Sequence, residues 1–183
     1  MYLKRKIDEY LLEWKKNEER LPLIIKGARQ IGKTESINHF AEQNYSNIVS
    51  INFVLEPKYK TILSDGYAVE DIIKNISMID TSKKFIAGDT VIIFDELQEF
   101  PDIATALKSF RIDGRFDVIC SGSLLGINYR KIHSNSVGYK TDYEMFSMDF
   151  EEFLWANAEF ALTREIRNHF SDFSPMGKKL HEK

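Results

Sequence analysis

Residues 27 to 34 read Gly27-Ala28-Arg29-Gln30-Ile31-Gly32-Lys33-Thr34, a full match to the phosphate-binding pattern G-x-x-x-x-G-K-[ST]. They follow the short apolar run Leu23-Ile24-Ile25, which is typical of a strand that ends in a glycine turn. In such a loop, backbone N–H groups wrap a phosphate chain and lead into the positive end of a helix. The octet therefore predicts a strand, a phosphate-binding loop and a helix in succession.

Individual positions of this loop have expected roles. Lys33 would reach the β- and γ-phosphates of a nucleotide, and Thr34 would offer its hydroxyl to Mg²⁺. Gly27 and Gly32 supply backbone angles and a close approach that a side chain would block. The alternative is a glycine-rich turn with a solvated lysine. We predict that ATP is bound by Gly27, Ala28, Arg29, Gln30, Ile31, Gly32, Lys33, Thr34 and Glu35.

A second segment, Val91-Ile92-Ile93-Phe94-Asp95-Glu96, lies about sixty residues downstream. Its four apolar residues predict a strand buried on both faces of a parallel sheet, with both carboxylates at its ligand-binding carboxyl end. The segment looks like a Walker B motif, in which Asp95 would hold Mg²⁺ through water. Glu96 would orient and polarise the water that attacks the γ-phosphate. Alternatively, the two carboxylates cap a helix that begins at Leu97.

Composition indicates one domain with a hydrophobic core, since the chain has 183 residues, of which 43% are hydrophobic and 29% charged. The net charge of −3 provides no global attraction for nucleic acid, although a local basic patch or a solvated loop would fit Arg130, Lys131, His133 and Lys140. No segment resembles a signal peptide or reaches transmembrane length, so we expect a cytoplasmic protein with no membrane partner. Cys120 is the one cysteine in the sequence, and its neighbours predict that it is a buried strand residue.

Short apolar runs alternate with helical patterns, which is typical of a parallel sheet built from βαβ units. The periodicity predicts helices over 3–16, from 33, over 69–79 and from 101 through 110, and strands over 23–26, 48–53, 91–94 and 116–120. The stretch 56–67 fits neither pattern.

Ser121-Gly122-Ser123 would lie just past the last of these strands. Either Ser121 or Ser123 would sense the γ-phosphate there, or both are ordinary turn residues.

Five segments, GARQIGKT, VIIFDELQEFPD, LKSF, CSGSLLG and MDFEEFLWA, follow one another in this order. Their succession resembles a large bacterial and archaeal group of AAA-type P-loop ATPases over nearly all of residues 1–160. The resemblance implies a three-layer αβα sandwich with a parallel five-stranded sheet in the order 5-1-4-3-2. It also implies that Lys33, Thr34, Asp95 and Glu96 hold and activate MgATP.

Relatives in this group usually continue into a C-terminal domain of unsettled role. The resemblance thus predicts an ATPase domain over 1–160 and a helical tail over 161–183 that begins a missing or truncated domain. The tail region is aromatic, and we expect it either to dock onto that domain or a second subunit, or to form a helix pair that covers the sheet edge. Its aromatic residues are Phe146, Phe150, Phe153, Trp155, Phe160, Phe170 and Phe173.

Two departures from the group's pattern affect catalysis. Where many relatives have a Gly-Arg pair, this chain has Gly138-Tyr139-Lys140, so no arginine finger is assigned and Arg111, Arg115 and Arg130 stay candidates. The usual helical lid also has no counterpart after Trp155. Without finger and lid we expect slow hydrolysis by this chain alone, because stabilisation of charge on the transferring phosphate supplies much of the catalysis.

These observations predict a Mg²⁺-dependent ATPase in which water attacks the γ-phosphate, with Lys33, Glu96, Ser121 and Ser123 as catalytic residues. An ATP-binding switch that controls a partner with little turnover is the second hypothesis. A phosphotransferase ranks third, because no acceptor-binding motif accompanies the loop.

Overall fold

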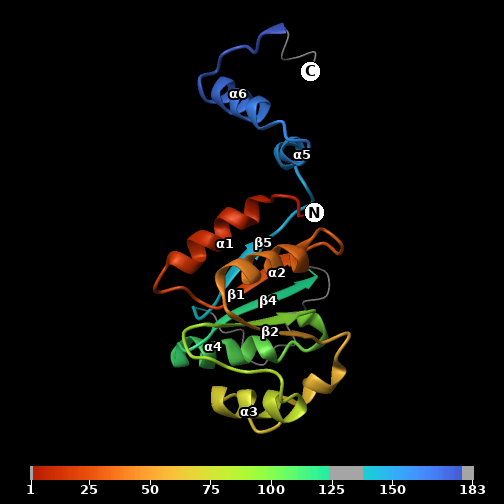
Figure 1. Ribbon diagram of the computed structural model, residues 1–183, viewed down its shortest axis with the longest axis vertical. Helices are drawn as coiled ribbons and strands as arrows, with labels where there is room; N and C mark the ends of the chain where they lie inside the picture. Colours follow the sequence, from red (N-terminus) through yellow and green to blue (C-terminus); the bar gives the residue numbers. More distant parts are fainter. Residues whose placement is uncertain (1, 124–137, 179–183) are drawn as a thin grey trace.

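The structure, a computed structural model, describes residues 2–123 and 138–178 (Figure 1). Three members of the suggested basic patch, Arg130, Lys131 and His133, lie outside the described residues, and the finger candidate Arg130 is one of them. The elements in chain order are α1 (Lys6–Lys16), β1 (Leu23–Gly27), α2 (Lys33–Asn44), β2 (Asn47–Asn52), the 3₁₀ turn η1 (Pro57–Thr61), α3 (Val69–Ile79), β3 (Thr90–Asp95), the 3₁₀ turn η2 (Leu97–Glu99), α4 (Ile103–Asp113), β4 (Asp117–Ser123), β5 (Thr141–Glu144), α5 (Phe150–Ala156) and α6 (Phe160–Ser171).

A parallel sheet of five strands forms the centre of the described chain, in the order β2-β3-β4-β1-β5. This confirms the predicted order 5-1-4-3-2. Every residue of β3 is buried, as the apolar run predicted, because helices cover both faces of the sheet. Gly27, at the end of β1, pairs with Ser123, and Asp95, at the end of β3, pairs with Asn52. The carboxyl ends of four strands therefore meet at one edge.

Two hydrophobic cores lie on opposite faces of the sheet. Ile92 and Phe94 of β3 belong to the core beneath α3 and α4, whereas Val91 and Ile93 belong to the core beneath α1 and α2. The alternation follows from the strand geometry, in which successive side chains point to opposite faces. The result is the three-layer αβα sandwich (Figure 1).

Element boundaries differ from the predictions at a few ends. Helix α1 begins at Lys6 rather than at residue 3, and α4 begins two residues after Pro101. The prediction that the fourth strand ends at Cys120 was wrong, because β4 continues to Ser123 in register with β1. A turn-like run of serines and glycine thus becomes strand through pairing with a distant segment. Cys120 itself is fully buried, as predicted.

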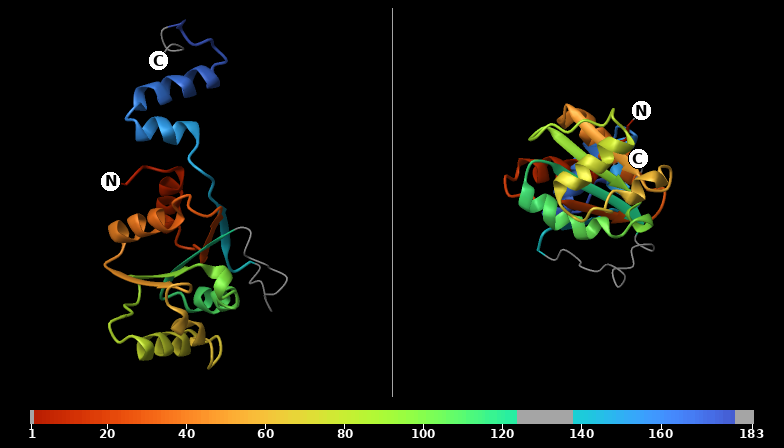
Figure 2. Two further views of the ribbon diagram at one scale, coloured as in Figure 1. Left: turned by 90° about the vertical axis from the view of Figure 1, so that its right-hand side faces the viewer. Right: turned by 90° about the horizontal axis from the view of Figure 1, so that it is seen from below.

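The last two helices stand beyond one end of the sandwich and pack against each other (Figure 2). Trp155 is buried and lies beside the Lys4 ammonium group, with 4.9 Å from Nζ to the ring centre. The arrangement differs from a helix pair that covers the sheet edge. Other aromatic residues here are exposed: Phe146, Phe150, Phe153, Phe160, Phe170 and Phe173. In residues 2–123 and 138–178, no helix is long and apolar enough to cross a membrane.

Candidate functional site

The loop from Gly27 to Gly32 leaves the end of β1 and enters α2 at Lys33. Gly32 has φ of 93° and occupies the left-handed region that glycine tolerates best. Gly27 is needed for space, since a Cβ atom there would lie 2.2 Å from the carbonyl oxygen of Met145. Glycine is therefore required at both positions, at Gly32 for its backbone conformation and at Gly27 for lack of space.

Lys33 sits at the start of α2, with its side chain folded over the loop. Its ammonium group donates to the carbonyl oxygens of Gly27, at 3.1 Å, and Ala28, at 2.6 Å. Burial lowers the pKa of Lys33, while the charges of Glu96 and Asp95 oppose this shift. The ammonium group therefore lies against the backbone of the loop.

Asp95 is the meeting point of four elements. Its carboxylate accepts hydrogen bonds from Thr34 Oγ1 at 3.1 Å and from Asn52 Nδ2 at 3.0 Å. It also accepts one from the hydroxyl of Ser121, which is fully buried. The helix α2 and the strands β2, β3 and β4 each contribute one of these residues. Sequence analysis missed Asn52, whose one available signal was its position at the end of a predicted strand.

Glu96 follows β3 with a left-handed backbone, at φ of 59°. Its carboxylate accepts a hydrogen bond from Gln98 Nε2, and Gln98 Oε1 accepts one from the Ser123 backbone N–H at 3.1 Å. Glu96 precedes the 3₁₀ turn η2 without a side-chain capping bond, so the alternative role as a helix cap is not observed. Sequence analysis also missed Gln98 as a site residue.

A pocket of about 680 Å³ opens between the loop and the ends of β3 and β4. It brings together most of the predicted residues, with Ser123 at its wall, whereas Ser121 lies beneath it and reaches it through Asp95. Gly27, Ala28 and Ile31 do not line this pocket. Its walls are Arg29, Gln30, Gly32, Lys33, Thr34, Glu35, Val54, Asp95, Glu96, Gln98, Glu99, Gly122 and Ser123.

A second hollow of about 500 Å³ adjoins the first on the other side of the loop. The two share Gln30, Gly32 and Glu35 as walls. Its remaining lining comes from the N-terminal segment, the loop and α2, and the connection between β5 and α5: Tyr2, Leu3, Arg5, Ile31, Ser36, Ser147 and Met148. The loop is therefore bordered by space on both sides.

Comparison with known sequences assigns the chain to a family. Residues 19–154, well over half of the chain, match the sequence profile of the family described as AAA domain. The chain belongs to the AAA domain family. At the level of the family, this membership supports binding and hydrolysis of ATP. No curated protein sequence matches this chain significantly.

A solved structure shares the fold of this chain at low sequence identity. A structure of Drosophila ORC bound to DNA has a TM-score of 0.50 and 10% identity, over 76% of this chain and 89% of that chain. A structure of C. elegans PCH-2 has a TM-score of 0.45 and 12% identity, over 95% of this chain and 49% of that chain. The AAA domain thus spans about half the length of the PCH-2 chain.

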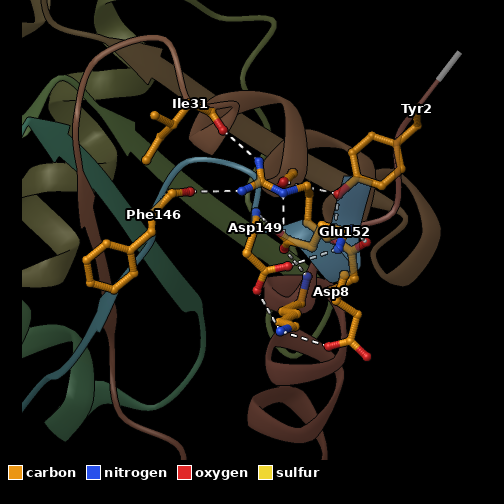
Figure 3. A network of polar contacts seen from close by, with 10 residues as sticks. Tyr2, Asp8, Ile31, Phe146, Asp149 and Glu152 are labelled. Atoms are coloured by element: carbon orange, nitrogen blue, oxygen red, sulfur yellow. Dashed lines mark hydrogen bonds and ion pairs between the residues drawn. The ribbon is translucent and has the colours of Figure 1, made fainter. Parts of the chain in front are cut away.

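A buried arginine, Arg5, links the loop to two other segments of the chain. Figure 3 shows the network of polar contacts that includes Ile31, Phe146 and Glu152. Arg5 donates to the carbonyl oxygens of Ile31, at 2.7 Å, and Phe146, at 2.8 Å. Its Nε lies 3.1 Å from Glu152 Oε1, and both side chains are nearly inaccessible. Glu152 also accepts from the Lys6 backbone N–H at 2.7 Å. The N-terminal segment, the nucleotide loop and α5 are tied together at this point, which no sequence pattern indicated.

The two described finger candidates lie elsewhere on the AAA domain. Neither Arg111 nor Arg115 lines either pocket beside the loop. Arg115 forms ion pairs with Asp113 and Glu70, and the hydrogen bonds to Asp113 raise the pKa of its guanidinium. Lys140, of the suggested basic patch, pairs with Asp142 at 2.7 Å. Among the described residues, Arg29 is the arginine that lines the larger pocket.

Proposed function

We propose that this AAA domain binds MgATP in the larger pocket and hydrolyses it by attack of water on the γ-phosphate. The observation that carries the proposal is the convergence of Lys33, Thr34, Asp95 and Glu96 on one pocket, although they come from separate segments. The family membership supports the same activity at a coarser level.

We infer the role of each pocket residue from the chemistry of its side chain. Lys33 would exchange the carbonyl oxygens of its own loop for phosphate oxygens, which offer the ammonium group full negative charges. Thr34 and Asp95 present a hydroxyl and a carboxylate, the oxygen ligands that Mg²⁺ prefers, so the donor set fits this ion. Mg²⁺ would neutralise charge on the phosphates. Asn52 and Ser121 would hold the Asp95 carboxylate in orientation.

Glu96 would orient the attacking water, and Ser123 would stand near the γ-phosphate as a sensor. The smaller hollow would receive the base, because it continues around the loop and presents the apolar side chains of Leu3, Ile31 and Met148 beside Tyr2. Glu96 and Ser123 lie at the carboxyl ends of β3 and β4, the edge at which parallel sheets bind ligands.

A binding switch with little turnover is the second candidate. The position of Arg111 and Arg115 away from both hollows favours it. Neither arginine can then place its positive charge beside the transferring phosphate and stabilise it. The larger pocket has no wall from α5 or α6. The Asp95 and Glu96 pair favours real hydrolysis instead.

Calorimetric titration of ATP and ADP, with and without Mg²⁺, tests the nucleotide site. We expect Mg²⁺-dependent binding by the wild type in about the micromolar range and its loss in Lys33→Ala. Lys74→Ala, which removes an exposed lysine from α3, is the matched control and should bind as the wild type does. Absence of binding by the wild type would contradict the proposal.

Single-turnover hydrolysis by Glu96→Gln separates the two candidates. An ATPase should lose about 10²–10⁴-fold in rate while it keeps its affinity for ATP. Equal, slow rates in wild type and variant, with tight ATP binding in both, would favour the switch. Glu42→Gln, at an exposed position of α2, is the control for a change in charge alone.

Further predictions from the sequence go beyond the nucleotide site. The exposed phenylalanines of α5 and α6 support a docking surface for a further domain or a second copy of the chain. A monodisperse monomer in light scattering that binds no hydrophobic dye would contradict this. A cytoplasmic location, membership of the bacterial and archaeal group, and a domain boundary at residue 160 stay predictions.

A further inference from the structure

Gln98 connects two parts of the site with one side chain. Its amide nitrogen donates to the Glu96 carboxylate, and its amide oxygen accepts from the Ser123 backbone N–H at 3.1 Å. Gln98 is half-buried in the turn η2 and lines the larger pocket. The end of β3 and the end of β4 are therefore bridged by a single carboxamide at the wall of the larger pocket.

The Glu96 side chain depends on this bridge for its orientation. Glutamate has several rotatable bonds, and holding it in one rotamer opposes its conformational entropy. Within the described residues, no hydrogen bond to the Glu96 carboxylate is found besides that from Gln98. The left-handed backbone at φ of 59° directs the side chain but does not restrain its outer bonds.

We propose that Gln98 is a positioning residue that holds Glu96 in the orientation needed to align the attacking water. The inference rests on the proposed ATPase function. A carboxamide suits this role because it donates to a carboxylate and accepts from a backbone N–H at the same time. It is also neutral, so it holds Glu96 without cancelling the negative charge that polarises the water.

Through Ser123, the bridge also connects Glu96 to the neighbouring strand β4. Ser123 lines the pocket at the end of β4, and its backbone N–H is the group that Gln98 binds. A shift of this strand end on binding of the γ-phosphate would therefore move the carboxamide, and with it Glu96. The bridge links occupancy of the γ-phosphate position to alignment of the water.

Single-turnover hydrolysis and ATP affinity of Gln98→Ala test the inference together. We expect the rate to fall by about tenfold to a hundredfold, as for a misplaced catalytic group. The dissociation constant for ATP should change by less than about threefold, which is under 0.7 kcal/mol. Gln98→Glu keeps the shape but cannot donate to Glu96 and repels it, so its rate should be at least as low. Gln43→Ala, which truncates an exposed glutamine of α2, should behave as the wild type does.

A double-mutant cycle with Glu96→Gln distinguishes positioning from a structural role. If Gln98 acts through Glu96, adding Gln98→Ala to Glu96→Gln should leave the rate unchanged. Additive losses, an unchanged rate in Gln98→Ala, or a loss of ATP affinity as large as the loss of rate would each overturn the inference while leaving the ATPase proposal intact. A wild type that binds ATP but shows no turnover would overturn both.

Discussion

Thr34 donates a hydrogen bond of 3.1 Å to Asp95, although the two residues are 61 positions apart in the chain. The contact joins the first turn of α2 to the end of β3. It brings together the hydroxyl of the phosphate loop and the carboxylate of the buried strand, which are oxygen donors of the kind that Mg²⁺ prefers. The pairing depends on the parallel order of β3, β4 and β1.

Replacing Thr34 by alanine should weaken the effect of Mg²⁺ on ATP binding. The variant loses the hydroxyl that faces Asp95, and a hydrogen bond to a charged group contributes about 1.5–3 kcal/mol, or roughly tenfold to a hundredfold in affinity. Titration calorimetry with and without Mg²⁺ measures the difference. Thr34→Ser retains the hydroxyl and should keep most of the Mg²⁺ effect. A Thr34→Ala protein with the full effect would exclude Thr34 from the site of the ion.

Gly27→Ala should destabilise the fold as well as the loop. The added methyl group would lie 2.2 Å from the Met145 carbonyl oxygen and 2.6 Å from Ile31 Cδ1, so the backbone after β5 must shift. Overpacking of this kind costs about 1–3 kcal/mol. Thermal denaturation should therefore show a melting temperature lower by roughly 2–12 °C. Gly177→Ala, where a methyl group meets no atom within 4 Å, is the control and should melt with the wild type.

The Arg5 and Glu152 ion pair should show strong coupling in a double-mutant cycle. Only 9% and 6% of these side chains are exposed, and removing one partner leaves a buried charge, at about 3–5 kcal/mol. Denaturant unfolding of Arg5→Met, Glu152→Gln and the double variant measures the coupling. The double variant should lose much less free energy of unfolding than the sum of the losses in the two single variants. The exposed pair Lys4 and Glu9 offers the comparison, with coupling of about 1 kcal/mol or less. Additive losses at Arg5 and Glu152 would contradict the expectation.

Acid should weaken the contact between α5 and α6. The hydrogen bond from Arg167 lowers the pKa of Glu151 below its ordinary value, with Lys6 acting in the same direction and burial opposing it. A carboxyl with a lowered pKa in the folded state contributes stability above its unfolded value of about 4.3, and this contribution is lost as pH falls through the folded value.

Denaturant unfolding of wild type and Glu151→Gln at several pH values measures this contribution. The wild type should be the more stable protein near neutral pH, and the two should converge in acid below about pH 4.3. A gap between them that persists in acid would show that Glu151 contributes through packing instead. Glu42→Gln is the control, since that residue is exposed on α2.

The phosphate loop, the buried strand β3 and the helix α3 could all be predicted because their signals are local. Helix α3 spans Val69–Ile79 as predicted, since Val69, Ile72 and Ile76 recur at helical spacing and are buried. The end of β4 could not be predicted in the same way. Its last residues have the composition of a turn, and pairing with β1 makes them strand.

The polar partners of the site were the other features that the sequence did not reveal. Asn52 and Arg5 belong to no motif, and Gln98 lies in the segment VIIFDELQEFPD without a pattern that indicates its contact. Each acts through a contact made in three dimensions. Arg5 reaches Phe146, which lies 141 positions away. A side chain that acts through a distant partner leaves no periodicity or spacing in its own neighbourhood.

The sequence by itself determined the phosphate loop, the two carboxylates after a buried strand and the alternation of strands and helices, because each follows from the order of neighbouring residues. Only the tertiary structure decided which polar groups meet Asp95 and Glu96 and how the loop is fastened to α5. The physical reason is that hydrogen bonds between distant segments form only after parallel pairing has set the strand ends side by side.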